Sequence, residues 1–427
     1  MKRLVIKGGK KLTGEVAVSG SKNAALPILA ATILLNGEST ISNIPNLLDV
    51  ITILRVLKSL GIRAEYHAGG KVKIWNTGSV KHVAPYELVT KMRASFFVIG
   101  PILARKGLAK VPLPGGCAIG SRPVNIHIKG LEQLGASVRM EHGFVIVTAN
   151  QLQGKRIYLD FPSVGATETI IMAATFAKGK TIIENVAREP EIIDLANFLN
   201  KAGAKVSGAG TEVIEVEGVE SLHGIDYEII PDRVEAGTLM IAAAITGGEV
   251  KVKKAIPKHV EALTRKLQDI GVSVKVDQDS ILVKGNGKLK ATDVKTLPYP
   301  GFPTDIQPQL SSLLAVSKGT SVVTETIFEN RFMHVPELKR MGADIKIEGK
   351  SMIIHGVEKL SGAQVRVSDL RAGAALVLAG LAAEGETEID DIDRHLIRGY
   401  ENLVEKIQSL GGDIFAPTKK PALPNNS

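Results

Sequence analysis

The sequence predicts an α/β protein of two similar domains, each built from three copies of one unit, with buried helices inside and sheets outside. Two signatures, each repeated six times along the chain, predict the units. The length of 427 residues exceeds what one hydrophobic core usually covers, which favours two domains. Successive units lie roughly 65 to 72 residues apart, so six copies fill the chain and divide as three and three.

The first signature is an amphipathic helix that ends at a glycine and is followed at once by a short strand. Glycine supplies the left-handed residue that a helix C-cap needs, and β-branched residues then begin the strand. The copies start at Leu60, Leu134, Ala202, Ile270, Met341 and Leu410. Residues 260–270 and 396–410 carry apolar residues on one face only, so these helices are expected at the surface.

The second signature is a polar residue that opens a small, apolar helix. The copies begin near Ser21, Arg93, Ser163, Asp232, Thr304 and Ser368. Residues 24–35, 94–104, 168–177 and 372–383 are apolar nearly all round, which marks buried helices. A strand that begins with glycine follows each buried helix. In the first signature, the strand after the helix-ending glycine is itself followed by a second strand. The unit is therefore βαβαββ.

Composition indicates a protein of a reducing compartment. The chain is 44% hydrophobic and 23% charged, as is ordinary for a globular protein, and its single cysteine excludes an internal disulfide. The first residues hold too few apolar side chains for a signal peptide, and the longest apolar run, 372–383, is far short of a membrane span. A cytoplasmic location is therefore expected.

The net charge of +9 allows nucleic acid, a membrane surface or small anions as partners. The basic residues are spread along the chain, and an aromatic content of 4% offers no interleaving that would stack bases, so nucleic acid is the weaker choice. Nine histidines are scattered without the spacing of metal ligands, and no metal is expected.

Five residues that begin predicted helices are candidates for anion binding: Lys22, Arg93, Ser163, Asp305 and Asp369. Unpaired N–H groups and the helix dipole favour anions at such positions. If the two domains face each other with these helix starts inward, the cleft between them would trap anions. For any single serine or aspartate there, an ordinary N-cap is the better explanation. Capping does not explain Lys22 and Arg93, because a cation at a helix start is unfavourable unless an anion accompanies it.

Cys117, the only cysteine, lies in a glycine-rich loop at residues 112–123. Arg122 follows at a predicted helix start, and positive charge near a thiol favours the reactive thiolate. A lone cysteine is more often a small core residue. The glycines before Cys117 and the polar residues after it favour the reactive alternative.

The chain resembles the enolpyruvyl transferases, most closely the members that use UDP-N-acetylglucosamine as acceptor, from about residue 5 to about residue 414. The motifs that carry the resemblance are Ser-Gly-Ser-Lys-Asn (19–23), Met-Arg-Ala-Ser (92–95), Pro-Gly-Gly-Cys (114–117), Ser-Arg-Pro (121–123), Ser-Val-Gly-Ala-Thr (163–167), Pro-Asp-Arg-Val-Glu-Ala-Gly-Thr (231–238), Gly-Phe-Pro-Thr-Asp (301–305), Glu-Asn-Arg-Phe (329–332), Asp-Leu-Arg (369–371) and Arg-Gly-Tyr (398–400). The resemblance implies a two-domain inside-out α/β barrel. It implies residues 21–229 as the first domain, residues 1–20 with 230–427 as the second, and an active site in the cleft between them.

The resemblance also implies the reaction and its participants. The enolpyruvyl group of phosphoenolpyruvate would pass to the 3′-hydroxyl of UDP-N-acetylglucosamine by addition and elimination, with release of phosphate, as the first committed step of peptidoglycan synthesis. Asp305 would be the base, and Cys117 the acid that can also add covalently to phosphoenolpyruvate. The implied catalytic residues are Cys117, Asp305, Lys22, Arg122, Asp369, Arg371 and Arg398. The implied substrate-binding residues are Lys22, Asn23, Arg93, Arg122, Pro123, Val124, Asn125, Ile126, Ser163, Val164, Gly165, Thr304, Asp305, Ile327 and Arg331.

The expected partners are these two small molecules, with no cofactor, no nucleic acid and no membrane, and the expected state is a monomer. Asn125 departs from the aspartate of many relatives, which puts the uridine contact there in doubt. Cys117 predicts alkylation by the epoxide antibiotic fosfomycin. The alternatives are 5-enolpyruvylshikimate 3-phosphate synthase, which shares the fold and the donor, and a non-catalytic basic repeat protein that binds nucleic acid.

Overall fold

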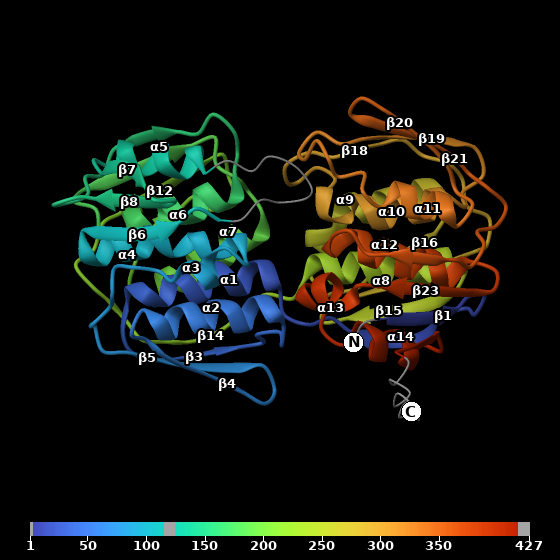
Figure 1. The fold of residues 1–427 in the computed structure, drawn as a ribbon, viewed down its shortest axis with the longest axis horizontal. Helices are drawn as coiled ribbons and strands as arrows, with labels where there is room; N and C mark the ends of the chain where they lie inside the picture. Colours follow the sequence, from blue (N-terminus) through green and yellow to red (C-terminus); the bar gives the residue numbers. More distant parts are fainter. Residues whose placement is uncertain (1–2, 115–123, 417–427) are drawn as a thin grey trace, which may run out of the picture.

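The computed structural model describes residues 3–114 and 124–416, which form two lobes side by side (Figure 1). The first lobe is blue to green in the figure, and the second is yellow to red with the N-terminal strands added. No helix among the described residues is long and apolar enough to cross a membrane. Cys117, Arg122 and Pro123 lie outside the described residues.

One unit of the first lobe shows the arrangement that the repeats predict. Its elements are β9 (Arg156–Tyr158), α6 (Val164–Ala174), β10 (Lys180–Glu184), α7 (Pro190–Lys201), β11 (Lys205–Ser207) and β12 (Val213–Glu217). The sheet order is β9-β10-β12-β11, with β9 parallel to β10 and the other pairs antiparallel. This is the predicted βαβαββ unit, and the parallel pair requires the helix that joins it.

The described residues form six sheets of three to five strands, and in several of them strands from distant parts of the chain complete the sheet. β1 (Arg3–Lys7) lies between β23 (Glu386–Asp390) and β24 (Asp413–Phe415), antiparallel to both. β2 (Thr13–Ala17) pairs parallel with β15 (Glu249–Lys253). In the first lobe β13 (Leu222–His223) and β14 (Asp226–Glu228) pair parallel with β3 (Leu35–Ser42). Strands from the two ends of each lobe's sequence thus complete sheets of that lobe.

The remaining strands are β4 (Arg63–His67), β5 (Lys71–Asn76), β6 (Leu108–Pro112), β7 (Ser137–Glu141), β8 (Phe144–Thr148), β16 (Ser273–Val276), β17 (Ser280–Lys284), β18 (Val294–Lys295), β19 (Thr320–Thr324), β20 (Asp344–Glu348), β21 (Ser351–His355) and β22 (Gln364–Arg366). The remaining surface helices and turns are α2 (Leu48–Ser59), α3 (Tyr86–Val89), α5 (Asn125–Gln133), η3 (Pro257–Val260), α9 (Glu261–Ile270), α11 (Val335–Arg340) and α13 (Ile392–His395).

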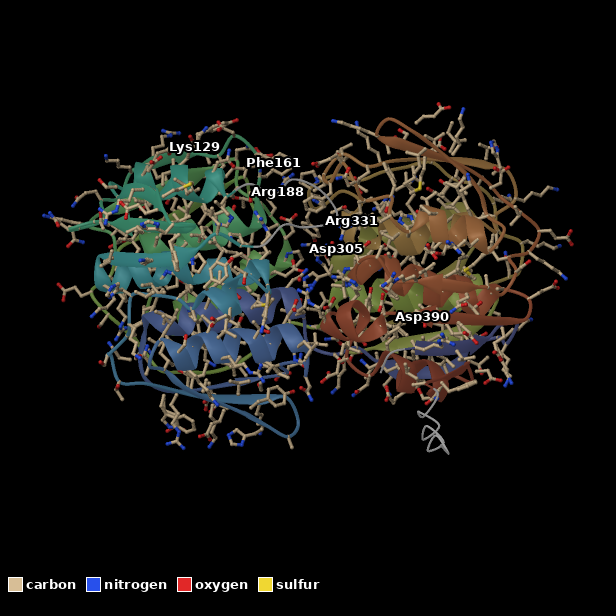
Figure 2. The ribbon with its side chains drawn as sticks, viewed as in Figure 1. Lys129, Phe161, Arg188, Asp305, Arg331 and Asp390 are labelled. Atoms are coloured by element: carbon tan, nitrogen blue, oxygen red, sulfur yellow. The ribbon has the colours of Figure 1, made fainter. Side chains whose placement is uncertain are left out.

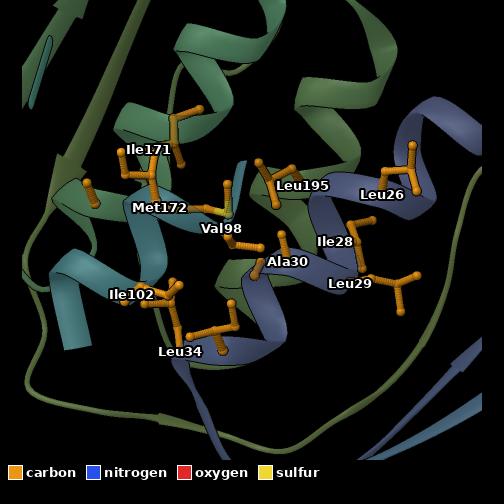
Figure 3. Packing of buried hydrophobic residues seen from close by; sticks show 14 of the residues in the cluster. Leu26, Ile28, Leu29, Ala30, Leu34, Val98, Ile102, Ile171, Met172 and Leu195 are labelled. Carbon is orange, nitrogen blue, oxygen red and sulfur yellow. The ribbon is translucent and has the colours of Figure 1, made fainter. Parts of the chain in front are cut away.

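The apolar helices of the sequence form the cores. These are α1 (Lys22–Ala31) with η1 (Thr32–Leu34), α6, α8 (Arg233–Ile245), η4 (Thr304–Ile306) with α10 (Gln307–Leu314), and α12 (Leu370–Ala382). Figure 3 shows α1, α6 and α7 packed together through side chains that include Ile28, Met172 and Leu195. The sheets lie around these helices in both lobes (Figure 1). Burying side chains on every face explains why these helices lack a polar face.

Two predicted helices differ from the structure. The segment expected to be helical over 94–104 begins as a 3₁₀ turn, η2 (Arg93–Val98), and continues as α4 (Ile99–Lys106). The helix expected over 396–410 is interrupted between η5 (Leu396–Arg398) and α14 (Leu403–Ser409). A Cβ on Gly399 would lie 2.4 Å from Leu370, and Asn402 has a φ of 52°, so tertiary packing breaks the helix there.

Two separate hydrophobic clusters are the basis for a division into domains. One cluster draws its residues from 25–229, and the other from 4–18 and 234–414. The chain passes between the lobes twice, and the two passages run together at a bridge between Gly20 and Pro231. We therefore propose residues 21–229 as one domain and residues 1–20 with 230–427 as the other.

Candidate active site

The site is built where starts of buried helices from the two lobes meet. Ser21 caps α1 of the first lobe, with its hydroxyl accepting the N–H of Ala24 at 3.3 Å. Asp232 caps α8 of the second lobe by accepting the N–H groups of Val234 and Glu235 through Oδ1. Its Oδ2 also accepts the backbone N–H of Lys22 at 3.3 Å. One carboxylate thus fastens the two helix starts, and the side chains that follow them share one region.

Asp305, in η4, lies between two arginines of the second lobe. Arg331 Nη1 is 2.8 Å from Oδ1, and Arg371 Nη2 is 2.9 Å from Oδ2. The side chain of Arg331 is 5% exposed and that of Arg371 is 2% exposed, whereas that of Asp305 is 27% exposed. Of these three side chains, solvent therefore reaches mainly Asp305. Figure 2 shows Asp305 and Arg331 on the side of the second lobe that faces the first.

The two arginines control the charge of Asp305. Burial by itself raises the pKa of Asp305, but the charges of Arg371 and Arg331 outweigh it and hold that pKa well below its usual range. In this arrangement Asp305 is a carboxylate at every physiological pH. A carboxylate with so low a pKa binds a proton weakly, so it gains strength as a base only when the arginines turn toward another anion.

The arginines retain donors for such an anion. Nε and Nη1 of Arg371 and Nε of Arg331 have no hydrogen-bond partner among the described residues. The guanidinium of Arg371 lies over the ring of Tyr400, 5.4 Å from its centroid, and Gln309 Nε2 donates to the Tyr400 hydroxyl at 2.9 Å. A guanidinium fixed by stacking is suited to bidentate recognition of a carboxylate or phosphate.

Two further cations meet at Asp49, which sequence reasoning missed. Asp49, in the first turn of α2, lies 3.3 Å from Lys22 Nζ and 2.8 Å from Arg398 Nε, and its side chain is 6% exposed. Burial lowers the pKa of Lys22, and the charge of Asp49 opposes that lowering. The anion that a lysine at a helix start requires is therefore supplied within the chain. An aspartate in the first turn of an amphipathic helix gives no sequence signal beyond a favourable dipole contact.

Asp369 and Ser163 occupy the cap positions of their helices. Asp369 Oδ1 accepts the backbone N–H groups of Arg371 at 2.9 Å and Ala372 at 3.1 Å at the start of α12. Ser163 Oγ accepts the N–H of Ala166 at 3.4 Å at the start of α6. The N-cap interpretation thus accounts for both side chains, and Asp369 fixes the backbone from which Arg371 extends.

The expected acceptor-binding residues fall into two groups. In the first lobe the starts of α5 and α6 are adjacent, since a Cβ on Gly165 would lie 3.1 Å from the ring of His127. This brings together Val124, Asn125 and Ile126 with Ser163, Val164 and Gly165, while Asn23 is the second residue of α1 and Arg93 begins η2. The second group, Thr304, Asp305, Ile327 and Arg331, lies in the second lobe, where Arg331 Nη1 also donates to Thr304 Oγ1 at 2.9 Å.

A second cross-lobe cluster, also missed from the sequence, holds three buried glutamates. Glu191 at the start of α7 pairs with Arg233 Nε of α8 at 2.9 Å, and Glu189 Oε1 accepts the N–H of Tyr299 at 3.4 Å. Glu168 is 1% exposed, and neither of its carboxyl oxygens has a hydrogen-bond partner among the described residues. Burial, with the charges of Glu191 and Glu189, raises the pKa of Glu168 well above its usual value. The raised pKa and the lack of partners among the described residues favour the protonated form of Glu168, and Glu191 with Arg233 ties the lobes together.

Comparison with known proteins places this geometry in a family. The family model described as EPSP synthase (3-phosphoshikimate 1-carboxyvinyltransferase) matches residues 6–407. A protein of Carboxydothermus hydrogenoformans named UDP-N-acetylglucosamine 1-carboxyvinyltransferase 2 is 56% identical over 416 residues, which cover 97% of this chain and 99% of that protein. A protein of Staphylococcus saprophyticus with the same name is 55% identical over 417 residues, with the same coverage.

Solved structures agree on the fold. The enolpyruvyl transferase NikO from Streptomyces tendae has a TM-score of 0.88 and 26% sequence identity, and the match covers 97% of this chain and all of that one. EPSP synthase from Acinetobacter baumannii has a TM-score of 0.77 at 21% identity, over 97% of this chain and 99% of that one. The second likeness shows the shared mixed α/β fold alone.

Proposed function

Since the chain belongs to the EPSP synthase family of carboxyvinyltransferases, we propose that it transfers the 1-carboxyvinyl group of phosphoenolpyruvate to the 3′-hydroxyl of UDP-N-acetylglucosamine and releases phosphate. Relatives that are 55% and 56% identical over nearly the whole chain carry the name of this activity. EPSP synthase, the alternative acceptor chemistry, is similar to this chain only at 21% identity. The protein is therefore a transferase whose acceptor is a sugar nucleotide.

The observation that carries the proposal is the gathering of four cations around two carboxylates between the lobes. Arg331 and Arg371 flank Asp305, and Lys22 and Arg398 flank Asp49. Phosphoenolpyruvate brings a phosphate and a carboxylate, and charge-assisted hydrogen bonds to it contribute about 1.5–3 kcal/mol each. Two cation pairs match the two anionic groups of the donor.

The reaction needs a base near the sugar hydroxyl, and Asp305 is our candidate. The hydroxyl oxygen forms a bond to C2 of phosphoenolpyruvate as its proton passes to the carboxylate, and C3 takes a proton from the acid, for which we propose Cys117. Loss of the C3 proton and departure of phosphate then restore the double bond. An anionic ligand that engages Arg371 and Arg331 weakens their hold on Asp305, so its pKa rises toward the value at which it accepts a proton well.

Electrostatic stabilisation by the surrounding cations supplies the larger part of the acceleration in this proposal. The arginines are buried, and charges in such a setting act with little reorganisation. We propose Arg122 as a further member of the set and Asp369 as the residue that orients Arg371 through its backbone. The acceptor would lie between the starts of α5 and α6 and the Thr304 loop.

The finer features of the family extend the proposal. We propose the two-domain inside-out barrel, with the active site between the domains, and a place for the reaction at the start of peptidoglycan synthesis in the cytoplasm. The protein would act as a monomer without a metal or organic cofactor. Cys117 would be alkylated by fosfomycin.

The test is phosphate release from phosphoenolpyruvate by the purified protein, with UDP-N-acetylglucosamine or shikimate 3-phosphate as acceptor. We expect phosphate release with UDP-N-acetylglucosamine as acceptor and none with shikimate 3-phosphate. We also expect this release to be lost in Asp305→Ala and in Cys117→Ala. Release with shikimate 3-phosphate instead would overturn the acceptor, and full activity of Asp305→Ala would overturn the base.

A further inference from the structure

Glu325 is a buried carboxylate that the proposed reaction does not use. It follows β19 directly and is 1% exposed. Among residues 3–114 and 124–416 its hydrogen-bond partners are hydroxyl and backbone N–H groups and it forms no ion pair, although a buried charge is costly unless it is paired or well hydrogen-bonded. The hydrogen-bond partners of Glu325 must therefore stabilise its carboxylate.

Hydrogen bonds replace the missing cation. Oε1 accepts from Thr296 Oγ1 at 2.8 Å and from the backbone N–H groups of Ile327 at 2.8 Å and Phe328 at 3.1 Å. Oε2 accepts from Thr304 Oγ1 at 2.9 Å. The two oxygens have different tasks: Oε1 shapes the loop that leads to Arg331, and Oε2 contacts η4, the turn that carries Thr304 and Asp305.

The bond from Thr304 sets the direction of a chain of hydrogen bonds. Because a carboxylate can only accept, the Thr304 hydroxyl must point its hydrogen at Glu325. Its lone pairs then face Arg331 Nη1, which donates to Thr304 at 2.9 Å and pairs with Asp305 Oδ1 at 2.8 Å. The sequence of contacts runs from Glu325 through Thr304 and Arg331 to Asp305.

We propose that Glu325 is a positioning residue for the acceptor substrate: through Oε2 it fixes the Thr304 hydroxyl as a hydrogen-bond acceptor, and through Oε1 it holds the loop of Ile327 and Arg331. This rests on the proposed function, in which those residues bind the sugar nucleotide. Buried and fully hydrogen-bonded, Glu325 meets the requirement for a group that locks the residues around a binding site.

The substitution Glu325→Gln separates the two tasks. The amide oxygen of glutamine still accepts the three bonds made to Oε1, so the loop is preserved. Its amide nitrogen replaces Oε2 and donates, which turns the Thr304 hydrogen away from position 325 and changes the hydrogen-bonding direction that the hydroxyl offers to the substrate. The KM for UDP-N-acetylglucosamine is expected to rise about tenfold, with kcat and the KM for phosphoenolpyruvate each changed by less than about threefold.

A double-mutant cycle with Thr304→Val shows whether the effect passes through the hydroxyl. In the Thr304→Val background the further change Glu325→Gln is expected to alter the acceptor KM by less than about twofold, since no hydroxyl remains to be oriented. An equal rise in both backgrounds, or no rise in the single variant, would overturn the proposal.

Asp194→Asn is the matched control for a purely structural effect. Asp194, on α7 of the first lobe, is 2% exposed and likewise accepts from a side-chain hydroxyl, Tyr227 Oη at 2.6 Å, and from a backbone N–H, Ile230 at 3.2 Å. The Asp194→Asn variant is expected to have a lower melting temperature than wild type and an unchanged KM for the acceptor. A rise in the acceptor KM equal to that of Glu325→Gln would show general loosening and contradict the positioning role.

The wild-type protein distinguishes the two proposals. Phosphate release with UDP-N-acetylglucosamine supports the function, and the kinetic cycle then decides the role of Glu325. If the wild type binds UDP-N-acetylglucosamine in calorimetry but does not turn over, the proposed function fails, and the same cycle measured on Kd decides the role. Absence of binding to the wild type overturns both.

Discussion

Replacing Asp305 with asparagine removes the charge that offsets two buried arginines. Arg331 and Arg371 are nearly inaccessible to solvent and hold Asp305 at 2.8 Å and 2.9 Å, so its loss leaves two like charges without a counter-charge. Breaking a buried pair in this way costs about 3 kcal/mol, the lower end of the usual range because Asp305 is partly exposed. For a lobe of this size that corresponds to a fall in melting temperature of about 6–12 °C. The kcat for phosphate release should fall by about 10²–10⁴ if Asp305 is the base.

Asp390→Asn is the control for a carboxylate of similar exposure in a different setting (Figure 2). Asp390 is 32% exposed and pairs with Arg3, whose side chain is 42% exposed, at 2.8 Å. A surface pair of this kind contributes about 0–1 kcal/mol, so the melting temperature should hardly change. Calorimetric scans of the three proteins, with and without phosphoenolpyruvate, measure the difference. An equal melting temperature for Asp305→Asn and Asp390→Asn would refute the account of the buried arginines, and a kcat loss below about tenfold would refute the base.

Three further predictions follow from single contacts. Glu168→Gln should raise the melting temperature relative to wild type, and this difference should grow between about pH 5 and pH 8. Because the pKa of Glu168 is raised in the folded state, folded wild type keeps a proton that the unfolded chain releases. Wild type therefore loses stability as the pH rises, and the variant does not. A difference independent of pH would contradict this. Lys22→Ala and Arg398→Ala should each raise the KM for phosphoenolpyruvate about 10–100-fold, and by less than the product when combined, because both cations contact Asp49; factors that multiply would exclude that coupling. Fosfomycin with the sugar nucleotide should increase the intact mass of wild type and leave Cys117→Ala unchanged, and an unchanged wild-type mass would remove Cys117 as the nucleophile.

The repeats allowed much of the fold to be predicted from the sequence, because each unit states its own local chemistry. The glycine that ends a helix, the polar residue that opens the next and the all-apolar pattern of residues 372–383 are local signals, and α12 over Leu370–Ala382 agrees with them. The sequence allows Ser163 and Asp369 to be N-caps or anion-binding residues, and their contacts in the structure are those of N-caps. The arginines of Asp305 came from the resemblance, since no spacing relates positions 305, 331 and 371.

Contacts between distant positions could not be predicted. Asp49 and Arg398 are separated by 349 residues, and neither position differs in type from many others on a surface helix. The roles of Glu191 and Glu325 depend on partners that only folding brings close. Glu191 pairs with Arg233, and Glu325 accepts a hydrogen bond from Thr304. The break before α14 also depends on tertiary packing, because Gly399 packs against Leu370 at the start of α12.

The position of β1 between β23 and β24 has a consequence for how the protein is made. β1 leaves the ribosome before its partner strands, Glu386–Asp390 and Asp413–Phe415, and most of the described chain is translated between them. At about 5–20 residues per second, translation of the intervening chain keeps β1 waiting for about 20–80 s. The first lobe draws its cluster from 25–229 alone and so has all of its residues while synthesis continues. The second lobe completes the sheet of β1 only after Asp413–Phe415 has been synthesised, and until then Leu4 and Ile6 of β1, which are fully buried in the folded protein, lack that cover.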